Sequence, residues 1–399
     1  MLPRRVFLLP TLITLLITLV VISLFFIQRD PADELTSSLG KDPTFKELSV
    51  YFEDLAKEKG ASYAFDVLGR VELPQNIDLH LLGHIVGDQL YIQEGIDGIK
   101  KCSQDFRNAC SHSVVIGALI ENGEGILPEV KNACHGAPGG VGAYTMCFHG
   151  FGHGVLAYND YTLPDAVEFC KKVGTEEFYN REYVECVGGA VMEMIAGVHD
   201  RATWEEKSHI YFKESDPLYP CSADFIDDEV RGICYTYLTP HLFEAVGANL
   251  GKPTAYDFDK AFKLCSVLPE KDTLSRNACY GGFGKEFVVL AQNRDIRKIE
   301  SMNEEQLRKV FSWCLLADTK EGVTQCMFSA VQSLYWGGEN DPGAVTRFCS
   351  LIEESSYQGA CFGEIIGAMS TYVNDSVYRE EYCKKIPFQY RNQCKEILL

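Results

Sequence analysis

Residues 258–290 read FDKAFKLCSVLPEKDTLSRNACYGGFGKEFVVL and contain one complete copy of the unit that recurs along this chain. An apolar run with helical spacing ends at Cys265, and a second apolar run, rich in glycine, begins at Cys279. Apolar residues three and four positions apart predict a helix that buries one face. The stretch therefore predicts two helices whose neighbouring ends are joined by a disulfide across a short loop.

The same pattern recurs in the spacing of the sixteen cysteines. Taken two at a time in chain order, the cysteines of a pair are 8 to 16 residues apart, and the second member of each pair returns every 33 to 48 residues, the period of helical-hairpin arrays. No C-x-x-C occurs, which argues against zinc ribbons, thioredoxin-like motifs and c-type haem attachment. We expect disulfides formed in an oxidising compartment. The expected pairs are Cys102–Cys110, Cys134–Cys147, Cys170–Cys186, Cys221–Cys234, Cys265–Cys279, Cys314–Cys326, Cys349–Cys361 and Cys383–Cys394.

The repeat predicts an all-α fold in which disulfide-stapled helical hairpins form an α/α solenoid. The glycine-rich second helices are expected in a crowded inner layer, since each interior glycine costs about 1 kcal/mol relative to alanine and needs a compensating close contact. Alternation of inner and outer helices would also suit a closed α/α toroid. The period resembles that of TPR-like and Sel1-like solenoids, although the TPR consensus is absent.

A short motif adds a second resemblance. Residues 147–154 match CxHGxGHG, with LGH upstream and DPLYPC downstream. In these motifs the chain resembles uncharacterised exported Cys-rich helical proteins of prokaryotes. The resemblance covers most of the chain after residue 42 and brings no known activity with it.

The N-terminal segment predicts a membrane anchor. Residues 6–27 carry no charge and are long enough, at about 1.5 Å per residue, to cross a hydrocarbon core of roughly 30 Å. Arg4 and Arg5 precede the segment, which holds the N-terminus in the cytoplasm, and no A-x-A cleavage pattern follows it. We therefore expect a single-pass protein with cytoplasmic residues 1–5, an uncleaved transmembrane signal anchor at 6–27, a linker at 28–42 and an extracytoplasmic helical-repeat domain at 43–399. A cleaved export signal is the alternative. The net charge of −19 argues against a nucleic-acid partner.

Five of the nine histidines occupy matched positions in three successive units. Counted from the cysteine that opens each second helix, histidine stands two or six residues further on, and in the first unit Asp78 takes the cysteine's place. Positions two and six share one helical face, and neighbouring helices lie about 8–10 Å apart, so the rings could converge. Several imidazoles facing one point suit zinc, copper or iron. The predicted ligands are His80, His84, His112, His149 and His153.

Three carboxylates are candidates for the second shell of that site: Asp78, Asp88 and Glu193. The remaining histidines share no repeat position, so we interpret them as structural; they are His135, His199, His209 and His241. The H-E-x-x-H motif of zincin proteases is absent. The alternative for the five matched histidines is that their rings only pack in a crowded layer.

The sequence therefore predicts a membrane-anchored, extracytoplasmic helical-repeat protein that binds about one transition-metal ion. If that ion keeps an open position, metal-activated water or a redox metal could make the protein a metal-dependent enzyme. A non-enzymatic solenoid scaffold that binds a protein or peptide on its concave face is the rival hypothesis. The membrane, through residues 6–27, is the one partner that the sequence indicates directly.

Overall fold

The computed structural model describes residues 43–74, 77–337, 342–373 and 375–398, together with residues 32 and 35. Regular structure in this part of the chain is helical, and no β-strand occurs in it. None of the helices described there is both long enough and apolar enough to cross a membrane. The predicted anchor at 6–27, the segment 1–5 and nearly all of the 28–42 linker lie outside the described residues.

The helices alternate along the chain as the cysteine repeat predicts. The first helices of the hairpins are α7 (Leu127–His135), α9 (Leu163–Cys170), α14 (Ala255–Ser266), α16 (Glu304–Cys314), α18 (Gly343–Ser350) and α20 (Ser376–Lys385). The second helices are α5 (Leu79–Glu94), α6 (Asp105–Asn122), α8 (Gly140–Tyr158), α10 (Arg181–Ala196), α12 (Asp228–Tyr237), α15 (Thr273–Ala291), α17 (Lys320–Gly337), α19 (Ser355–Tyr372) and α21 (Arg391–Leu398).

Several shorter or additional helices complete the chain. The additional α-helices are α3 (Phe45–Lys59), α4 (Ala61–Arg70), α11 (Arg201–Lys207) and α13 (Thr239–Ala245). Short 3₁₀ helices connect the others: η1 (Gly95–Lys101), η2 (Gly123–Ile126), η3 (Lys171–Val173), η4 (Ser208–Ile210), η5 (Ile296–Lys298) and η6 (Phe388–Tyr390).

First and second helices differ in burial. A capping box of Thr254 and Asp257 begins α14, which buries one stripe at the i, i+3, i+4, i+7 spacing of an amphipathic helix, namely Phe258, Ala261, Phe262 and Cys265. By contrast, α8 buries every residue from 147 to 154, glycines included. The second helices therefore include the crowded layer that the glycines predicted.

Eight disulfides staple the hairpins. They join the cysteines in sequence order, in the pairs predicted from their spacing, with Cα atoms 5.4–5.7 Å apart. That separation is normal for an unforced disulfide. Closing loops of 8 to 16 residues restricts the unfolded chain by about 3 kcal/mol per bond in the chain-entropy description.

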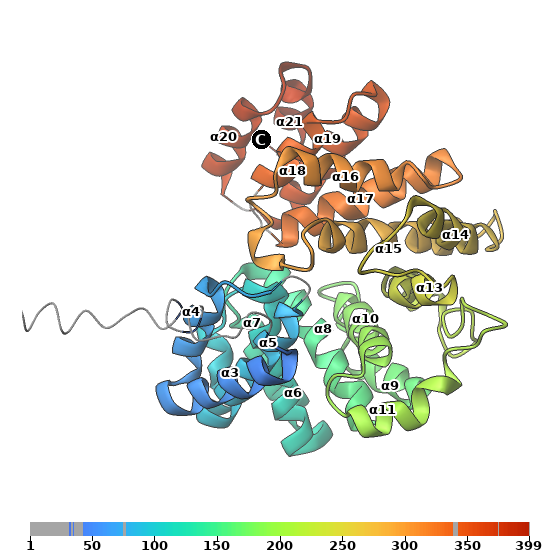
Figure 1. Cartoon of the computed structure of the whole chain (residues 1–399). Helices are drawn as coiled ribbons and strands as arrows, with labels where there is room; N and C mark the ends of the chain where they lie inside the picture. The colour runs from blue at the N-terminus through green and yellow to red at the C-terminus, as the bar shows by residue number, and fades with distance from the viewer. Residues whose placement is uncertain are drawn as a thin grey trace, which may run out of the picture.

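The second helices pack against one another in chain order from α5 to α21. The array also turns back on itself, because α17 contacts α6 and α19 contacts α8, and Figure 1 shows the orange and red helices above the blue ones. Hydrogen bonds join the later helices to the N-terminal ones. Arg107 donates to Ser333 Oγ at 3.1 Å. Arg297 donates to the carbonyls of Leu68 and Val71 at 2.9 and 2.6 Å.

The backbones of α8 and α10 are in direct contact. A Cβ atom built on Gly152 would lie 1.9 Å from the carbonyl oxygen of Cys186. Only glycine permits that approach, and it draws the histidines of α8 toward the carboxylates of α10.

Candidate metal centre

Six imidazole rings meet between α5, α6, α8 and the segment that follows α10. Neighbouring rings lie with centroids 4.6 to 6.0 Å apart. Two imidazoles bound to one tetrahedral ion would have centroids about 5 Å apart, given metal–nitrogen bonds of about 2.0–2.1 Å. We call this set the imidazole cluster; its members are His80, His84, His112, His149, His153 and His199.

The cluster contains all five histidines predicted from the repeat. It also contains His199, which the repeat did not group with them: its ring lies 5.4 Å from that of His84 and 5.9 Å from that of His153. His199 follows Gly197, whose backbone turns sharply at φ +60 just after α10. His199 does not stand two or six residues after the cysteine that opens a second helix, so the spacing of the histidines does not predict that it joins the cluster.

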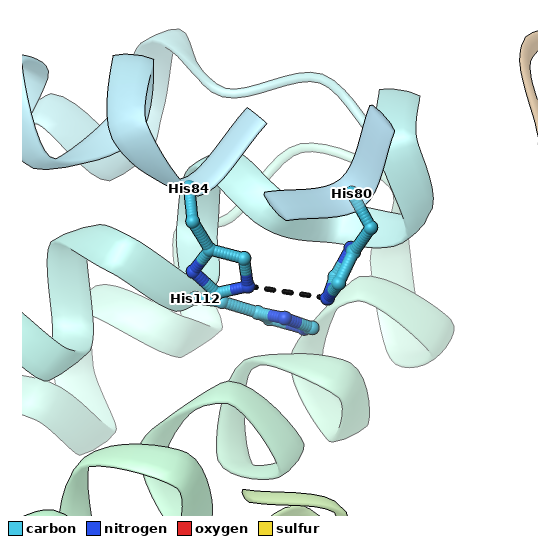
Figure 2. Close-up of side chains that lie close together, drawn as sticks. All are labelled: His80, His84 and His112. Atoms are coloured by element: carbon cyan, nitrogen blue, oxygen red, sulfur yellow. Dashed lines mark hydrogen bonds between the residues drawn. The ribbon is translucent and has the colours of Figure 1, made fainter. Parts of the chain in front are cut away.

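His80, His84 and His112 form the first triad, with one nitrogen of each within 4.8 Å of the others. Figure 2 shows the two rings of α5 side by side and the ring of His112 beneath them. His84 and His112 are buried and His80 is partly buried. Three imidazole nitrogens at this spacing match the donor set of a structural or catalytic transition-metal site.

Hydrogen bonds fix the protonation of the first two rings. Nδ1 of His80 lies 2.6 Å from the carbonyl oxygen of Phe106 and must donate to it. The Ser113 hydroxyl donates to the backbone carbonyl of His84 at 2.8 Å, so its oxygen accepts from His84 Nδ1 at 3.1 Å. In the neutral rings both protons therefore sit on Nδ1, and both Nε2 atoms carry lone pairs.

Those two lone pairs face each other. Nε2 of His80 and Nε2 of His84 are 3.1 Å apart, the contact drawn as a dashed line in Figure 2. With the Ser113 proton on the His84 carbonyl, neither neutral ring has a proton there to share. Two nitrogens bound to one tetrahedral Zn²⁺ are about 3.3 Å apart. A cation between them removes the repulsion, which makes this contact the most specific sign of a metal site in the cluster.

His112 brings the third nitrogen. Both of its ring nitrogens are buried without a well-formed hydrogen bond, which is costly for a polar group unless an ion or water satisfies it. Its ring fits only because position 150 is glycine: a Cβ there would lie 2.4 Å from His112 Cδ2. One glycine of the CxHGxGHG motif thus makes room for a ring of the triad.

An unusual turn at the start of α6 shapes the same site. Phe106, Arg107 and Asn108 all have left-handed backbone angles, with φ of 53, 56 and 64. Such angles are costly for residues other than glycine and persist where the surrounding structure requires them. Here they direct the carbonyl of Phe106 to His80 and the side chain of Arg107 to α17.

On the other side of the cluster, Glu193 holds His153 and His199. Its Oε2 accepts from Nδ1 of His153 at 3.2 Å and from Nδ1 of His199 at 2.8 Å. Its Oε1 accepts from the Tyr161 hydroxyl at 2.6 Å and from the backbone N–H groups of Val198 and His199 at 2.8 and 3.0 Å. With both oxygens occupied by hydrogen bonds, Glu193 orients the two rings. One of its oxygens and one nitrogen of each ring also form a second group of possible ligand atoms within 4.8 Å of one another.

Burial keeps most of the cluster uncharged. It lowers the pKa of His80 to about 4. Burial also holds the pKa values of His84, His112 and His149 well below 6.5, and the neighbouring imidazoles add to the effect. Neutral imidazole is the form that binds a metal, so these rings are ready to coordinate at neutral pH.

The Glu193 side of the cluster differs. Burial opposes the charge on both partners, but the attraction between Glu193 and His199 outweighs it, so the pKa of His199 is raised and that of Glu193 is lowered. For His153 burial prevails over Glu193 and lowers the pKa. An ionised carboxylate thus stands behind two imidazoles.

The other predicted second-shell residues have different roles. Asp78 caps α5 by accepting from the N–H of Leu81 at 3.1 Å. Asp88 lies near the cluster and acts electrostatically on His199, and desolvation raises its pKa to about 6 although part of its surface stays exposed. Glu185, which the sequence did not single out, lies 3.8 Å from Nδ1 of His149, and burial raises its pKa.

Two cationic side chains, Lys285 and Arg107, lie on the side of the imidazole cluster that faces α12 and α15. Lys285 sits over the ring of Tyr237 at 4.0 Å and pairs with Glu286 at 3.3 Å. The same tyrosine ring packs against His149, with centroids 4.7 Å apart. Arg107 has a buried Nε without a hydrogen bond. Both cations and the carboxylate Glu185 therefore lie around Tyr237, on the side of the cluster that His149 faces.

The three other histidines lie outside the cluster. His135 stacks on Tyr144 with centroids 4.4 Å apart, His241 packs against Phe212 at 4.6 Å, and His209 is exposed. Their interpretation as residues outside the site agrees with these positions.

No family model, curated protein or solved structure matches this chain. Its function must therefore be argued from the cluster itself.

Proposed function

We propose that this protein binds a transition-metal ion at His80, His84 and His112. The observation that supports this most is the 3.1 Å contact between two Nε2 lone pairs whose rings are held by hydrogen bonds at Nδ1. The donors are all imidazole, which suits zinc, copper or iron and disfavours calcium and magnesium.

The proposal extends to the architecture and location of the chain. Eight disulfides indicate an oxidising, extracytoplasmic environment for the helical domain. We propose that residues 6–27 anchor it to the membrane and that the hairpins form an α/α solenoid rather than a closed toroid. The return of α17 to α6 supports a superhelix. From its motifs we also propose that the chain is similar to exported Cys-rich helical proteins of prokaryotes.

A bound ion with an open position would supply Lewis-acid or redox chemistry, including activation of water near neutral pH. Three features of the chain itself support this part of the proposal. Burial excludes water from His84 and His112, the Phe106 carbonyl and the Ser113 hydroxyl orient the ligands, and Glu193 holds a carboxylate nearby. These are features of a metal-dependent enzyme as well as of a metal carrier.

Elemental analysis of the full-length chain, purified in detergent from an oxidising compartment, tests the proposal. We expect zinc, copper or iron in the wild type, loss of the ion from the first triad in the His80→Ala/His112→Ala variant, and full content in His209→Ala, which removes an exposed histidine. Intact disulfides, checked by thiol titration, control for folding.

Wild-type protein without metal, which also takes up none after dialysis against Zn²⁺ or Cu²⁺, would contradict the proposal. The scaffold hypothesis, in which the rings only pack and the chain binds a protein or peptide, would then replace it.

A further inference from the structure

The Glu193 side of the imidazole cluster carries its own unsatisfied nitrogens. Nε2 of His153 and Nε2 of His199 are buried and have no hydrogen-bond partner. The Nδ1 atoms of both rings donate to the same oxygen of Glu193. Two imidazoles are thus held by one carboxylate, with their opposite nitrogens left for another ligand.

Glu193 is not the main ligand of an ion at these two nitrogens, because its oxygens are already in use. Five hydrogen bonds already reach its two oxygens, two from the imidazoles and three from Tyr161 and the backbone of residues 198–199. A carboxylate that accepts from Nδ1 of a histidine sets its tautomer and makes Nε2 a better metal ligand. The arrangement is therefore that of a carboxylate behind two metal-binding rings.

Nε2 of His153 and Nε2 of His199 do not belong to the first triad. Nε2 of His84 already faces His80, and its Nδ1 is bonded to Ser113. Ligand atoms within 4.8 Å of one another form two separate groups, His80–His84–His112 and His153–Glu193–His199, so the second pair of rings has a place for an ion of its own. Their rings lie 6.0 and 5.4 Å from that of His84, which places such an ion directly beside the first one.

Charge and a further ring support a second ion. Among the described residues, two carboxylates beside the second pair of rings carry no Lys or Arg partner: Glu193 is buried within the cluster, and Asp88 interacts electrostatically with His199. Glu185, 3.8 Å from His149 Nδ1, is already paired with Arg181 at 2.9 Å. Glu193 and Asp88 offset part of the added positive charge. The ring of His149 lies 5.2 Å from that of His153, and its Nδ1 is also buried without a partner.

We propose that the imidazole cluster holds two neighbouring transition-metal ions, the second bound by Nε2 of His153 and Nε2 of His199, with Glu193 as the residue that positions both rings. This inference rests on the proposed function of the first triad and goes beyond the single ion that the sequence predicted. The ion would be of the class that imidazole prefers, for which Co²⁺ and Cu²⁺ are suitable probes.

The test is metal stoichiometry in the full-length chain, stripped by a chelator without reductant and reloaded with Co²⁺. We expect two ions per wild-type chain, one in His153→Ala/His199→Ala, one in His80→Ala/His112→Ala, and two in His209→Ala. With Cu²⁺, the wild type should show an electron paramagnetic resonance signal broadened by the neighbouring ion, and each double variant a sharp single-site spectrum.

Glu193→Gln tests the positioning role. Glutamine keeps one acceptor oxygen but loses the charge, so the second ion should bind about 10–100-fold more weakly, while the affinity of the first triad stays unchanged. Competition with a chromophoric chelator measures both affinities. If the affinities for the first and the second ion fall equally, Glu193 supports only the fold.

The outcomes separate this inference from the proposed function. One ion that depends on His80 and His112 but not on His153 and His199 refutes the second site and leaves the first intact; the unpaired nitrogens would then be satisfied by buried water. One ion lost in both double variants means a single shared site and also refutes the inference. No ion in the wild type refutes both proposals.

Discussion

Replacing Gly152 by alanine should separate α8 from α10 and thereby disturb both the fold and the metal centre. The added Cβ would lie 1.9 Å from the carbonyl oxygen of Cys186, 2.8 Å from its carbonyl carbon and 3.0 Å from the N–H of Ala190. Real Cβ atoms essentially never approach another atom within 3.0 Å, so one helix must move by about 1 Å. The obstacle is backbone, and no side-chain rotation relieves it.

The magnitude follows from two opposing effects. Alanine is the better helix former by about 1 kcal/mol, but overpacking a filled interior costs about 1–3 kcal/mol and occasionally more. Because the clash is with backbone at two points, we expect the upper end of that range and a net loss of about 2 kcal/mol in the free energy of unfolding. His153 stands one residue further along α8, so its 3.2 Å contact with Glu193 should also open.

Urea unfolding of the disulfide-intact protein, followed by circular dichroism, measures the loss, and Co²⁺ stoichiometry measures the effect on the centre. Gly367→Ala is the matched control, since it lies inside α19 and its Cβ would meet nothing within 4 Å. We expect it to be neutral or slightly stabilising. If Gly152→Ala is as stable as Gly367→Ala and binds as much metal, the close approach of α8 and α10 is not what places the histidines.

Three further outcomes are expected. First, the metal-free protein should lose stability as the pH falls below about 6.5. Each buried histidine with a lowered pKa binds its proton only after unfolding, at up to about 1.4 kcal/mol per pH unit, and for His80 this continues to its folded pKa of about 4. The raised pKa values of Asp88, Glu185 and His199 oppose this but involve fewer groups; a urea midpoint at pH 5.5 equal to or above that at pH 7.5 would contradict it. Second, Tyr161→Phe removes a 2.6 Å hydrogen bond to the Glu193 carboxylate and should cost about 1.5–3 kcal/mol in thermal or urea unfolding; no change would show that the bond does not form. Third, replacing the Cys383–Cys394 disulfide by two alanines should cost about 3 kcal/mol yet leave the metal content unchanged, because this terminal staple belongs to α20 and α21; peptide mapping without reduction should show the other seven bonds unaltered.

Much of this architecture could be predicted from periodicity. The spacing of the cysteines gives the hairpins and the pairing of the disulfides, because a staple between consecutive helix ends depends only on the short loop between them. The histidine register gives His80, His84, His112, His149 and His153, because a repeat places equivalent positions on equivalent helix faces. Helical geometry is local, so three- and four-residue spacing in the sequence is enough to show it.

Other features depend on contacts between distant parts of the chain. His199 joins the cluster only because the chain turns at Gly197 and the backbone N–H groups of Val198 and His199 bind the buried Glu193. The left-handed turn at Phe106 lies in the short loop that the cysteine spacing predicts between Cys102 and Cys110, and the spacing does not give the path of that loop. Neither feature has a period, so no pattern in the sequence marks it.

The sequence by itself thus determined the hairpins, the staples and the face on which five histidines stand. Tertiary structure decided which nitrogens are left unsatisfied, because that depends on which hydrogen-bond partners fold against each ring: the Phe106 carbonyl on His80, Ser113 on His84 and Glu193 on His153. Those partners come from neighbouring helices, and their positions depend on close packing between helices that no local spacing specifies.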